Sequence, residues 1–218
     1  MSRIAGELVT EELEHDGGRQ VTVYVPPGPV DAVVFAADGA WHITHLSTAL
    51  ENASSASTMI VGVHGLPDDD GRLHEYVSGF NPERFAAHAE FFVNDVGRWV
   101  ESRFGVALPA ERTAVWGASL GAELALALGL RHPDVYGAVF SVSPGAGYQP
   151  PGVLPSPLPR FYLVAGRHEQ FFLDNAMRWA DALRDAEADV AMMQRDGEHG
   201  GAFWAEEFPL MVAWAFGR

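Results

Sequence analysis

The segment Thr113-Ala-Val-Trp-Gly-Ala-Ser-Leu-Gly121 (TAVWGASLG) is the part of the sequence most informative about the fold. Its apolar start, residues 113–116, predicts a buried strand, and the Ala/Leu-rich segment that continues to residue 130 predicts a helix. Between them, Gly117 and Gly121 flank Ser119 in a G-x-S-x-G pattern. Glycines at these places allow a sharp strand-to-helix turn that lifts the serine clear of the sheet. The stretch therefore predicts a nucleophile elbow, the alternative being an ordinary glycine-rich turn.

Strands and helices alternate on both sides of this turn. The patterns predict further strands over 20–25, 32–37, 58–63, 137–142, 161–165 and 189–193, and helices over 43–50, 82–104, 171–186 and 200–216. Such alternation is typical of an α/β fold with a mainly parallel sheet and helices on both faces, and the first strands could form an antiparallel edge. We expect a single domain over residues 1–218 with no large cap domain. The proline-rich segment 144–159 should lie over the carboxyl edge of the sheet and shape the substrate pocket.

The composition excludes several classes of function. The 218 residues include no cysteine, and all 14 basic residues are arginine. The chain therefore has no disulfide, no thiolate nucleophile, no Schiff-base lysine and no phosphate-loop lysine. A net charge of −15 argues against a nucleic-acid partner, because such proteins neutralise phosphates with a basic surface.

The N-terminal residues and the longest uncharged stretch bear on where the protein is located in the cell and on whether it binds a membrane. Residues 1–17 mix charges and lack the apolar run of a signal peptide, so we expect a cytoplasmic protein. The longest uncharged stretch, 135–159, is interrupted by prolines, which excludes a spanning helix and predicts no membrane partner. Aromatic residues of the last helix could be exposed and pair subunits into a homo-oligomer.

A serine hydroxyl is a weak nucleophile without a base. Three of the nine histidines follow Ser119, namely His132, His168 and His199. His132 stands at the end of the helix that follows Ser119, where it caps that helix. His199 follows the last strand, in a loop at the carboxyl edge of the sheet, where ligands bind in such folds. The sequence therefore predicts His199 as the general base, the alternative being a loop histidine that caps the final helix.

The third member of a triad is an acid that orients the imidazole. Glu169 follows the strand 161–165 and precedes His199 by thirty residues, which is room for one helix and one strand. We favour Glu169 over Asp174 and Asp196. The alternative role for Glu169 is a stabilising charge at the start of the next helix.

Backbone amides are predicted to stabilise the oxyanion of an attacked carbonyl. The N–H of Leu120 lies at the start of a helix, and a second donor, Gly39 or Ala40, comes from the turn that follows the strand 32–37. The alternative is a plain Asp-Gly turn.

Trp41, Arg72 and Arg167 are the candidate substrate-binding residues. The two arginines could meet an anionic substrate or pair with Glu75, Glu169 or the acidic run 68–70. The negative net charge favours pairing.

Metal and cofactor sites are not predicted. His42 and His45 have HxxH spacing, and His64 and His74 follow, but no HExxH accompanies them. These histidines, with Trp41, are expected to line an acyl or alcohol pocket. The acidic run 68–71 is expected to be a solvated loop rather than a calcium site.

From about residue 32 to residue 209 the chain resembles the putative-esterase family of α/β-hydrolases, which includes enterochelin (ferric enterobactin) esterases and esterase D-like enzymes. The matching pieces are Asp38-Gly39, Arg72-x-x-Glu75, Phe104-Gly105, the turn around Ser119, the segment 132–139, the turn 165–169, and His199 followed by Phe203-Trp204. The resemblance implies an α/β-hydrolase fold, an ester substrate, and Ser119, His199 and Glu169 as nucleophile, base and acid. Ala122 stands where the family usually has a second glycine. Glu198 stands where the family tends to have glycine, and it is a rival orienting acid.

These observations predict a serine esterase that cleaves a small-molecule carboxylic ester without a cofactor. A siderophore trilactone of the enterochelin type is one candidate substrate. Two alternatives stay open: acyl transfer to another alcohol on the same site, and a non-catalytic ligand-binding protein with this fold.

Overall fold

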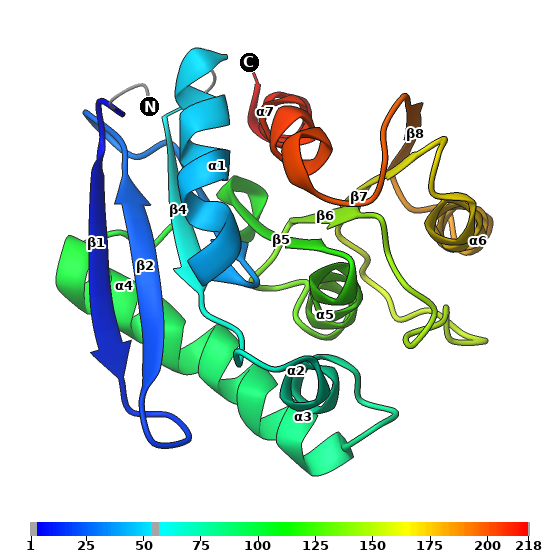
Figure 1. The fold of residues 1–218 in the computed structure, drawn as a ribbon, viewed down its shortest axis with the longest axis horizontal. Coiled ribbons are helices and arrows are strands. Elements are labelled where there is room, and N and C mark those ends of the chain that lie inside the picture. The colour runs from blue at the N-terminus through cyan, green and yellow to red at the C-terminus, as the bar shows by residue number, and fades with distance from the viewer. Residues whose placement is uncertain (1–3, 54–56, 218) are drawn as a thin grey trace.

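The computed structural model describes residues 4–53 and 57–217, in which eight strands form one sheet with helices on both faces (Figure 1). The strands are β1 (Glu7–Leu13), β2 (Arg19–Val25), β3 (Ala32–Ala36), β4 (Thr58–Val63), β5 (Thr113–Ala118), β6 (Ala138–Val142), β7 (Arg160–Gly166) and β8 (Val190–Arg195). Their order across the sheet is β1-β2-β4-β3-β5-β6-β7-β8. β2 runs antiparallel to β1 and β4, and every other pair of neighbours is parallel. The α/β class and the antiparallel edge are thereby confirmed.

Two helices cover one face of the sheet and the remaining long helices cover the other (Figure 1). The first pair is α1 (Gly39–Asn52) and α7 (Gly201–Phe216). The others are α2 (Asp69–Tyr76), α3 (Pro82–Glu90), α4 (Val96–Phe104), α5 (Leu120–Arg131) and α6 (Gln170–Asp185). The helix predicted over 82–104 is α3 and α4 joined by a π-helical segment, Phe91–Asp95, and a 3-10 turn, Ala110–Arg112, precedes β5.

A separate apolar core lies on each face of the sheet. Successive side chains of a strand point to opposite faces. In β5, Val115 joins the core under α3 to α6, and Trp116 joins the core under α1 and α7. Both side chains are fully buried, which explains why this strand reads as a continuous apolar run.

Two elements differ from the sequence-based expectation. β1 is an unpredicted edge strand whose sequence, ELVTEEL, is largely polar because one side of it has no neighbour. The acidic run expected to be a solvated loop instead starts α2. There Asp68 accepts a hydrogen bond from the Gly71 N–H at 2.7 Å, while Asp69 and Asp70 occupy the first turn.

The aromatic residues of α7 divide into two groups, because Trp204 and Trp214 are half-buried while the phenylalanines are buried. Phe203, Phe208 and Phe216 are buried, because α7 packs on the sheet beside α1. None of the described helices combines the length and the apolar character needed to cross a membrane.

The parallel strands bring their carboxyl ends to one edge of the sheet. There β3, β5, β7 and β8 each lead into a loop or turn that carries one expected site residue: Gly39, Ser119, Glu169 and His199. The segment 143–159 leaves the same edge from β6 and contains no helix or strand, so no helical cap is inserted there.

Candidate active site

The turn between β5 and α5 holds Ser119 in a strained conformation. Its φ of 54° and ψ of −120° lie in a region that residues with a side chain rarely adopt. Gly117 makes the turn possible, because a Cβ there would come within 1.9 Å of the Gly121 carbonyl oxygen. The Ser119 N–H donates to the Val142 carbonyl at 2.9 Å, which ties the turn to β6. Ser119 thus stands at the top of the sheet with its hydroxyl half-buried.

Ser119, His199 and Glu169 form a chain of contacts. The Ser119 Oγ lies 3.0 Å from His199 Nε2, and His199 Nδ1 lies 2.6 Å from Glu169 Oε2. A neutral imidazole with its proton on Nδ1 donates to the carboxylate and leaves Nε2 free to accept the serine proton. The structure therefore brings together three residues that the sequence separates by 80 and 30 positions.

Glu169 is also held by two further donors. Its Oε1 accepts hydrogen bonds from the Ser143 hydroxyl at 2.6 Å and from the Gly166 N–H at 2.6 Å. Burial acts to raise the pKa of Glu169, but the hydrogen bonds from His199, Ser143 and Gly166 outweigh it and keep the pKa below its usual value. Glu169 is thereby ionised at neutral pH, as an orienting acid must be.

Aromatic rings fix the plane of the His199 imidazole. Phe172 stacks on it with ring centroids 3.7 Å apart, and Trp204 meets it edge-on at 4.9 Å. Trp204 also donates its Nε1–H to Ser143 Oγ at 3.1 Å, which links it back to Glu169. No pattern in the sequence indicates these roles for Ser143, Phe172 and Trp204, because only the fold brings them to the histidine.

The expected oxyanion donors lie at two adjacent helix starts. Leu120 opens α5, and Gly39 and Ala40 open α1. None of these three N–H groups makes a hydrogen bond to another described residue. The two turns adjoin, because a Cβ at Gly121 would come within 3.1 Å of the Ala37 Cβ. Free amides at helix starts are suited to a developing negative charge.

The rival acids lie away from the imidazole. Asp174 accepts a hydrogen bond from Gln170 Nε2 at 2.7 Å, and Asp196 pairs with His168 Nε2 at 2.7 Å. Glu198 is exposed. Within residues 4–53 and 57–217, Glu169 is the acid that contacts His199.

The two arginines have different surroundings. Arg72 is buried and pairs with Asp38 at 2.7 Å and Asp69 at 2.9 Å, while its guanidinium stacks over the ring of Trp41 at 4.6 Å. Pairing was the favoured expectation, and Asp69 belongs to the acidic run that was named as a possible partner. Glu75, the other partner named for Arg72, pairs with Arg19 instead. Arg167 is exposed, and its side chain has no ion pair in the described residues.

A cavity of about 330 Å³ lies beside the triad, between α1 and α7. Its wall includes Trp41, His42, His45 and Trp204. Trp204 lines the cavity and also contacts the His199 imidazole. Burial lowers the pKa of His42, so this ring is neutral at pH 7. The cavity therefore has a largely aromatic wall, and Trp204 connects it to the triad.

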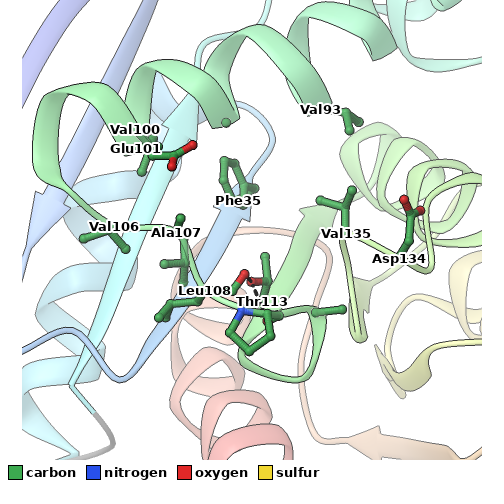
Figure 2. Close-up of a pocket in the computed structure, with 14 residues that line it drawn as sticks. Phe35, Val93, Val100, Glu101, Val106, Ala107, Leu108, Thr113, Asp134 and Val135 are labelled. Carbon is green, nitrogen blue, oxygen red and sulfur yellow. Dashed lines mark hydrogen bonds between the residues drawn. The ribbon is translucent and has the colours of Figure 1, made fainter.

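A second cavity, of about 250 Å³, lies at the other end of the sheet (Figure 2). Its wall is largely apolar and includes Val33, Val100 and Leu108, with Glu101 and Asp134 among the polar residues. Thr113, which begins β5, lines it, whereas Ser119 follows the end of that strand. This cavity is separate from the triad.

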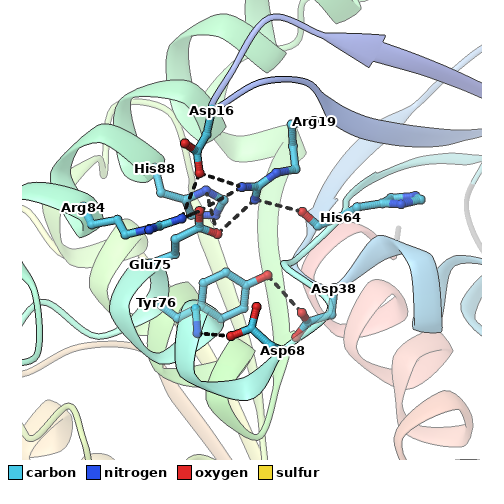
Figure 3. Close-up of polar contacts among 10 residues, drawn as sticks. Asp16, Arg19, Asp38, His64, Asp68, Glu75, Tyr76, Arg84 and His88 are labelled. Atoms are coloured by element: carbon cyan, nitrogen blue, oxygen red, sulfur yellow. Dashed lines mark hydrogen bonds and ion pairs between the residues drawn. The ribbon is translucent and has the colours of Figure 1, made fainter.

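The histidines can be examined as possible metal ligands from the side chains that surround them. His64 Nε2 shares a hydrogen bond with Thr22 at 2.8 Å, and His42 contacts Trp116 and Trp204 rather than a carboxylate. Among the described residues, one group of three, His15, Glu75 and His88, has potential ligand atoms within 4.8 Å of one another. Figure 3 shows Glu75 and His88 of this group.

Arginine makes that cluster a poor cation site. Arg19 donates to both carboxylate oxygens of Glu75, at 2.9 and 2.8 Å, and Arg84 lies 3.6 Å from the same carboxylate. A divalent cation would therefore face two guanidinium groups.

Comparison with known proteins relates the chain to an esterase family. A family model described as putative esterase matches residues 12–215. No curated protein matches the chain in sequence. The enterobactin esterase of Shigella flexneri is similar in structure, with a TM-score of 0.76, 19% identity, and coverage of 98% of this chain and 60% of that one. This chain therefore spans about 60% of the length of that relative.

Two shorter enzymes are also similar. A ferulic acid esterase from Anaeromyces mucronatus gives a TM-score of 0.75 at 17% identity, with coverage of 97% of this chain and 91% of that one. S-formylglutathione hydrolase from Staphylococcus aureus gives a TM-score of 0.75 at 12% identity, with coverage of 97% and 99%. At these identities the likeness shows a shared fold.

Proposed function

The chain belongs to the putative esterase family, and from this premise we propose that it is a carboxylic ester hydrolase with a Ser119–His199–Glu169 triad. The observation that carries the proposal is the pair of contacts made by the imidazole, 3.0 Å to the Ser119 hydroxyl and 2.6 Å to the Glu169 carboxylate. These contacts place a base within hydrogen-bond distance of the hydroxyl and an orienting carboxylate on the other side of the base, which is the geometry that nucleophilic catalysis needs.

The reaction follows from the positions of these atoms. Ser119 Oγ attacks the ester carbonyl while His199 Nε2 takes its proton. The oxyanion that forms is met by the N–H of Leu120 and by those of Gly39 and Ala40. His199 then protonates the leaving alkoxide, which leaves an acyl group on Ser119. Water attacks this acyl-enzyme with His199 as base and releases the acid.

We propose an uncharged ester with an aromatic or apolar group as the substrate class. The cavity beside the triad supports this choice, because Trp41, His42 and Trp204 give it a flat, neutral wall. The charge distribution also supports it, since Arg72 is already neutralised by Asp38 and Asp69. An anionic ligand would approach a chain of net charge −15.

A siderophore trilactone is the second candidate. The observation that favours it is the exposed guanidinium of Arg167, two residues before Glu169, which is available to an anionic catecholate. If the ligand is a trilactone, Arg167→Gln raises its KM and leaves the KM of p-nitrophenyl acetate unchanged. Equal effects on both esters contradict the trilactone.

Hydrolysis of p-nitrophenyl acetate and p-nitrophenyl benzoate by wild type, Ser119→Ala and Ser141→Ala tests the proposal. Ser141 is the matched control, because it is a buried serine whose hydroxyl has no partner among the described residues. We expect activity in wild type and Ser141→Ala, and its loss in Ser119→Ala. Equal activity in Ser119→Ala would remove the serine mechanism.

Acyl transfer and a binding role make different predictions. A transferase forms an ester product when glycerol is added as an acyl acceptor, and its release of nitrophenol accelerates. A hydrolase yields acetate alone at an unchanged rate. A binding protein releases no nitrophenol at all.

A further inference from the structure

The turn from β3 into α1 contains Asp38, a residue that takes no part in the proposed steps of ester hydrolysis. Asp38 precedes the expected donors Gly39 and Ala40, with φ 55° and ψ 41°, in the left-handed region. Residues with a side chain seldom adopt that region. Asp38 is only 1% exposed, so the contacts of a buried carboxylate must offset both the strain and the lost hydration.

The Asp38 carboxylate is turned away from its own helix. An aspartate at a helix start ordinarily accepts a hydrogen bond from an amide of the first turn. Asp38 makes no such bond. Its Oδ1 accepts instead from Arg72 Nε at 3.0 Å and from the Tyr76 hydroxyl at 2.9 Å, the latter shown in Figure 3, and its Oδ2 accepts from Arg72 Nη2 at 2.7 Å.

The surroundings leave the carboxylate little freedom to move. A Cβ at Gly65 would come within 2.4 Å of Asp38 Oδ1, and a Cβ at Gly121 would come within 3.2 Å of Oδ2. The carboxylate is thus enclosed between the loop after β4, the helix α2 and the first turn of α5. Gly121 is two residues from Ser119, so the Asp38 carboxylate lies close to the turn that carries the nucleophile.

We propose that Asp38 is a positioning residue for the oxyanion hole, and that Arg72 and Tyr76 of α2 act through it. By holding the carboxylate, they keep a negative charge away from the free amides of Gly39 and Ala40. A carboxylate that capped α1 would accept a hydrogen bond from the N–H of Ala40 or of the next residue, and its negative charge beside these amides would repel the oxyanion. The inference rests on the proposed ester hydrolysis and extends it to three residues that touch no reacting atom.

A matched pair of tyrosines tests this role. Tyr76 and Tyr136 are both fully buried, but the Tyr136 hydroxyl has no partner in the described part of the chain. We expect Tyr76→Phe to lower kcat for p-nitrophenyl acetate about tenfold, with KM within about twofold, because one holder of the turn is lost. Tyr136→Phe leaves both constants unchanged.

A second readout separates positioning from folding. Phenylboronic acid bonded to Ser119 carries a negative oxygen like that of the oxyanion, so Tyr76→Phe should weaken its binding about tenfold as well. Asp38→Asn should lower kcat about a hundredfold. Melting temperatures identify a variant that fails to fold, and Tyr76→Phe, which keeps the ring in place, then decides the matter.

The outcomes separate the inference from the function on which it rests. If wild type is active while Tyr76→Phe behaves as Tyr136→Phe, or changes KM alone, the positioning role is overturned and the esterase stands. If wild type hydrolyses no ester and binds no boronic acid, the proposed function is overturned and the inference with it.

Discussion

His199 with Glu169 and His88 with Glu75 are two histidine–glutamate pairs in one protein, and they differ in how their atoms are partnered. Nδ1 of His199 lies 2.6 Å from its glutamate, whereas Nδ1 of His88 lies 3.8 Å from its own. His199 Nε2 contacts the Ser119 hydroxyl, while neither ring nitrogen of His88 has a hydrogen-bond partner among the described residues. The His199 side chain is 32% exposed and that of His88 is 1% exposed.

The difference shows that the other hydrogen-bond and ion-pair partners of the glutamate determine whether the neighbouring histidine can act as a general base. Glu75 is engaged by Arg19 through both oxygens, so it is already neutralised. Burial holds the pKa of His88 well below its usual value, and the positive charge of Arg19 lowers it further. Glu169 is held by neutral donors, Ser143 and the Gly166 N–H, and keeps its charge for the imidazole. A histidine becomes a base where a carboxylate faces it without a competing cation.

Replacing each of the two histidines with leucine should give the largest difference in activity between two variants. His199→Leu should lower kcat/KM for p-nitrophenyl acetate by about 10⁵-fold, because the general base is removed. His88→Leu should leave kcat/KM unchanged, and it should not reduce the free energy of unfolding, since it removes two unpartnered nitrogens and keeps an apolar side chain. Ester hydrolysis and urea unfolding measure the two effects. A loss of activity in His88→Leu comparable to that in His199→Leu would contradict the comparison.

The two glutamates should respond in opposite ways to replacement by glutamine. Glu169→Gln is expected to lower kcat about 10³-fold with little change in stability, because an amide can favour the wrong tautomer of His199. Glu75→Gln leaves the Arg19 guanidinium buried without its charge partner and should cost about 3–5 kcal/mol of unfolding free energy. The folded fraction of that variant should keep its kcat. If both variants lose only stability, Glu169 is a structural acid.

A third buried glutamate, Glu123, forms no ion pair with a histidine or an arginine of the described residues. Burial raises the pKa of Glu123 to about 7, although the backbone amides of Gly147 and Tyr148 act to lower it. The folded chain therefore binds this proton more tightly than the unfolded chain, and the stability from it is lost as pH rises from 4.5 towards 7.

Replacing Glu123 with glutamine tests whether burial raises its pKa and so makes the folded protein less stable at high pH. Glu123→Gln should be more stable than wild type at pH 8, by up to about 3 kcal/mol, and should differ little from wild type below pH 4.5. Urea unfolding at several pH values measures the difference, with the exposed Glu198→Gln as control. A variant that loses stability relative to wild type as pH rises would contradict the direction of the pKa shift.

The smallest effect is expected at Ser143, which completes the set of neutral donors to Glu169. Ser143→Ala should lower kcat/KM about three- to tenfold, the size expected for one lost hydrogen bond. Ser141→Ala, two residues earlier on β6, should change nothing, since its hydroxyl is unpartnered among the described residues. Equal rates for the two variants would show that Ser143 does not support the triad.

The parts of the fold that could be predicted are those specified by neighbouring residues. The run 113–121 contains its own strand, turn and helix start, and it gave both the α/β class and the nucleophile candidate. Glu169 and His199 could be proposed because each follows a readable strand. β1 could not, because an edge strand pairs on one side only and carries charged residues.

The parts that could not be predicted depend on contacts between distant residues. Ser143 meets Glu169 across 26 positions, and Asp38 meets Arg72 across 34. The latter pairing changes the interpretation of Arg72, which was a candidate for substrate binding and is bonded to the oxyanion turn instead. No local pattern shows which of several carboxylates an arginine will reach.

Labelling with a fluorophosphonate, followed by intact mass and peptide mapping, shows whether Ser119 is an activated nucleophile. We expect a single adduct on Ser119 in wild type, none in Ser119→Ala, and a strongly slowed reaction in His199→Leu, while His88→Leu reacts as wild type does. An unlabelled wild type, or an adduct that persists in Ser119→Ala, would contradict the proposed serine mechanism.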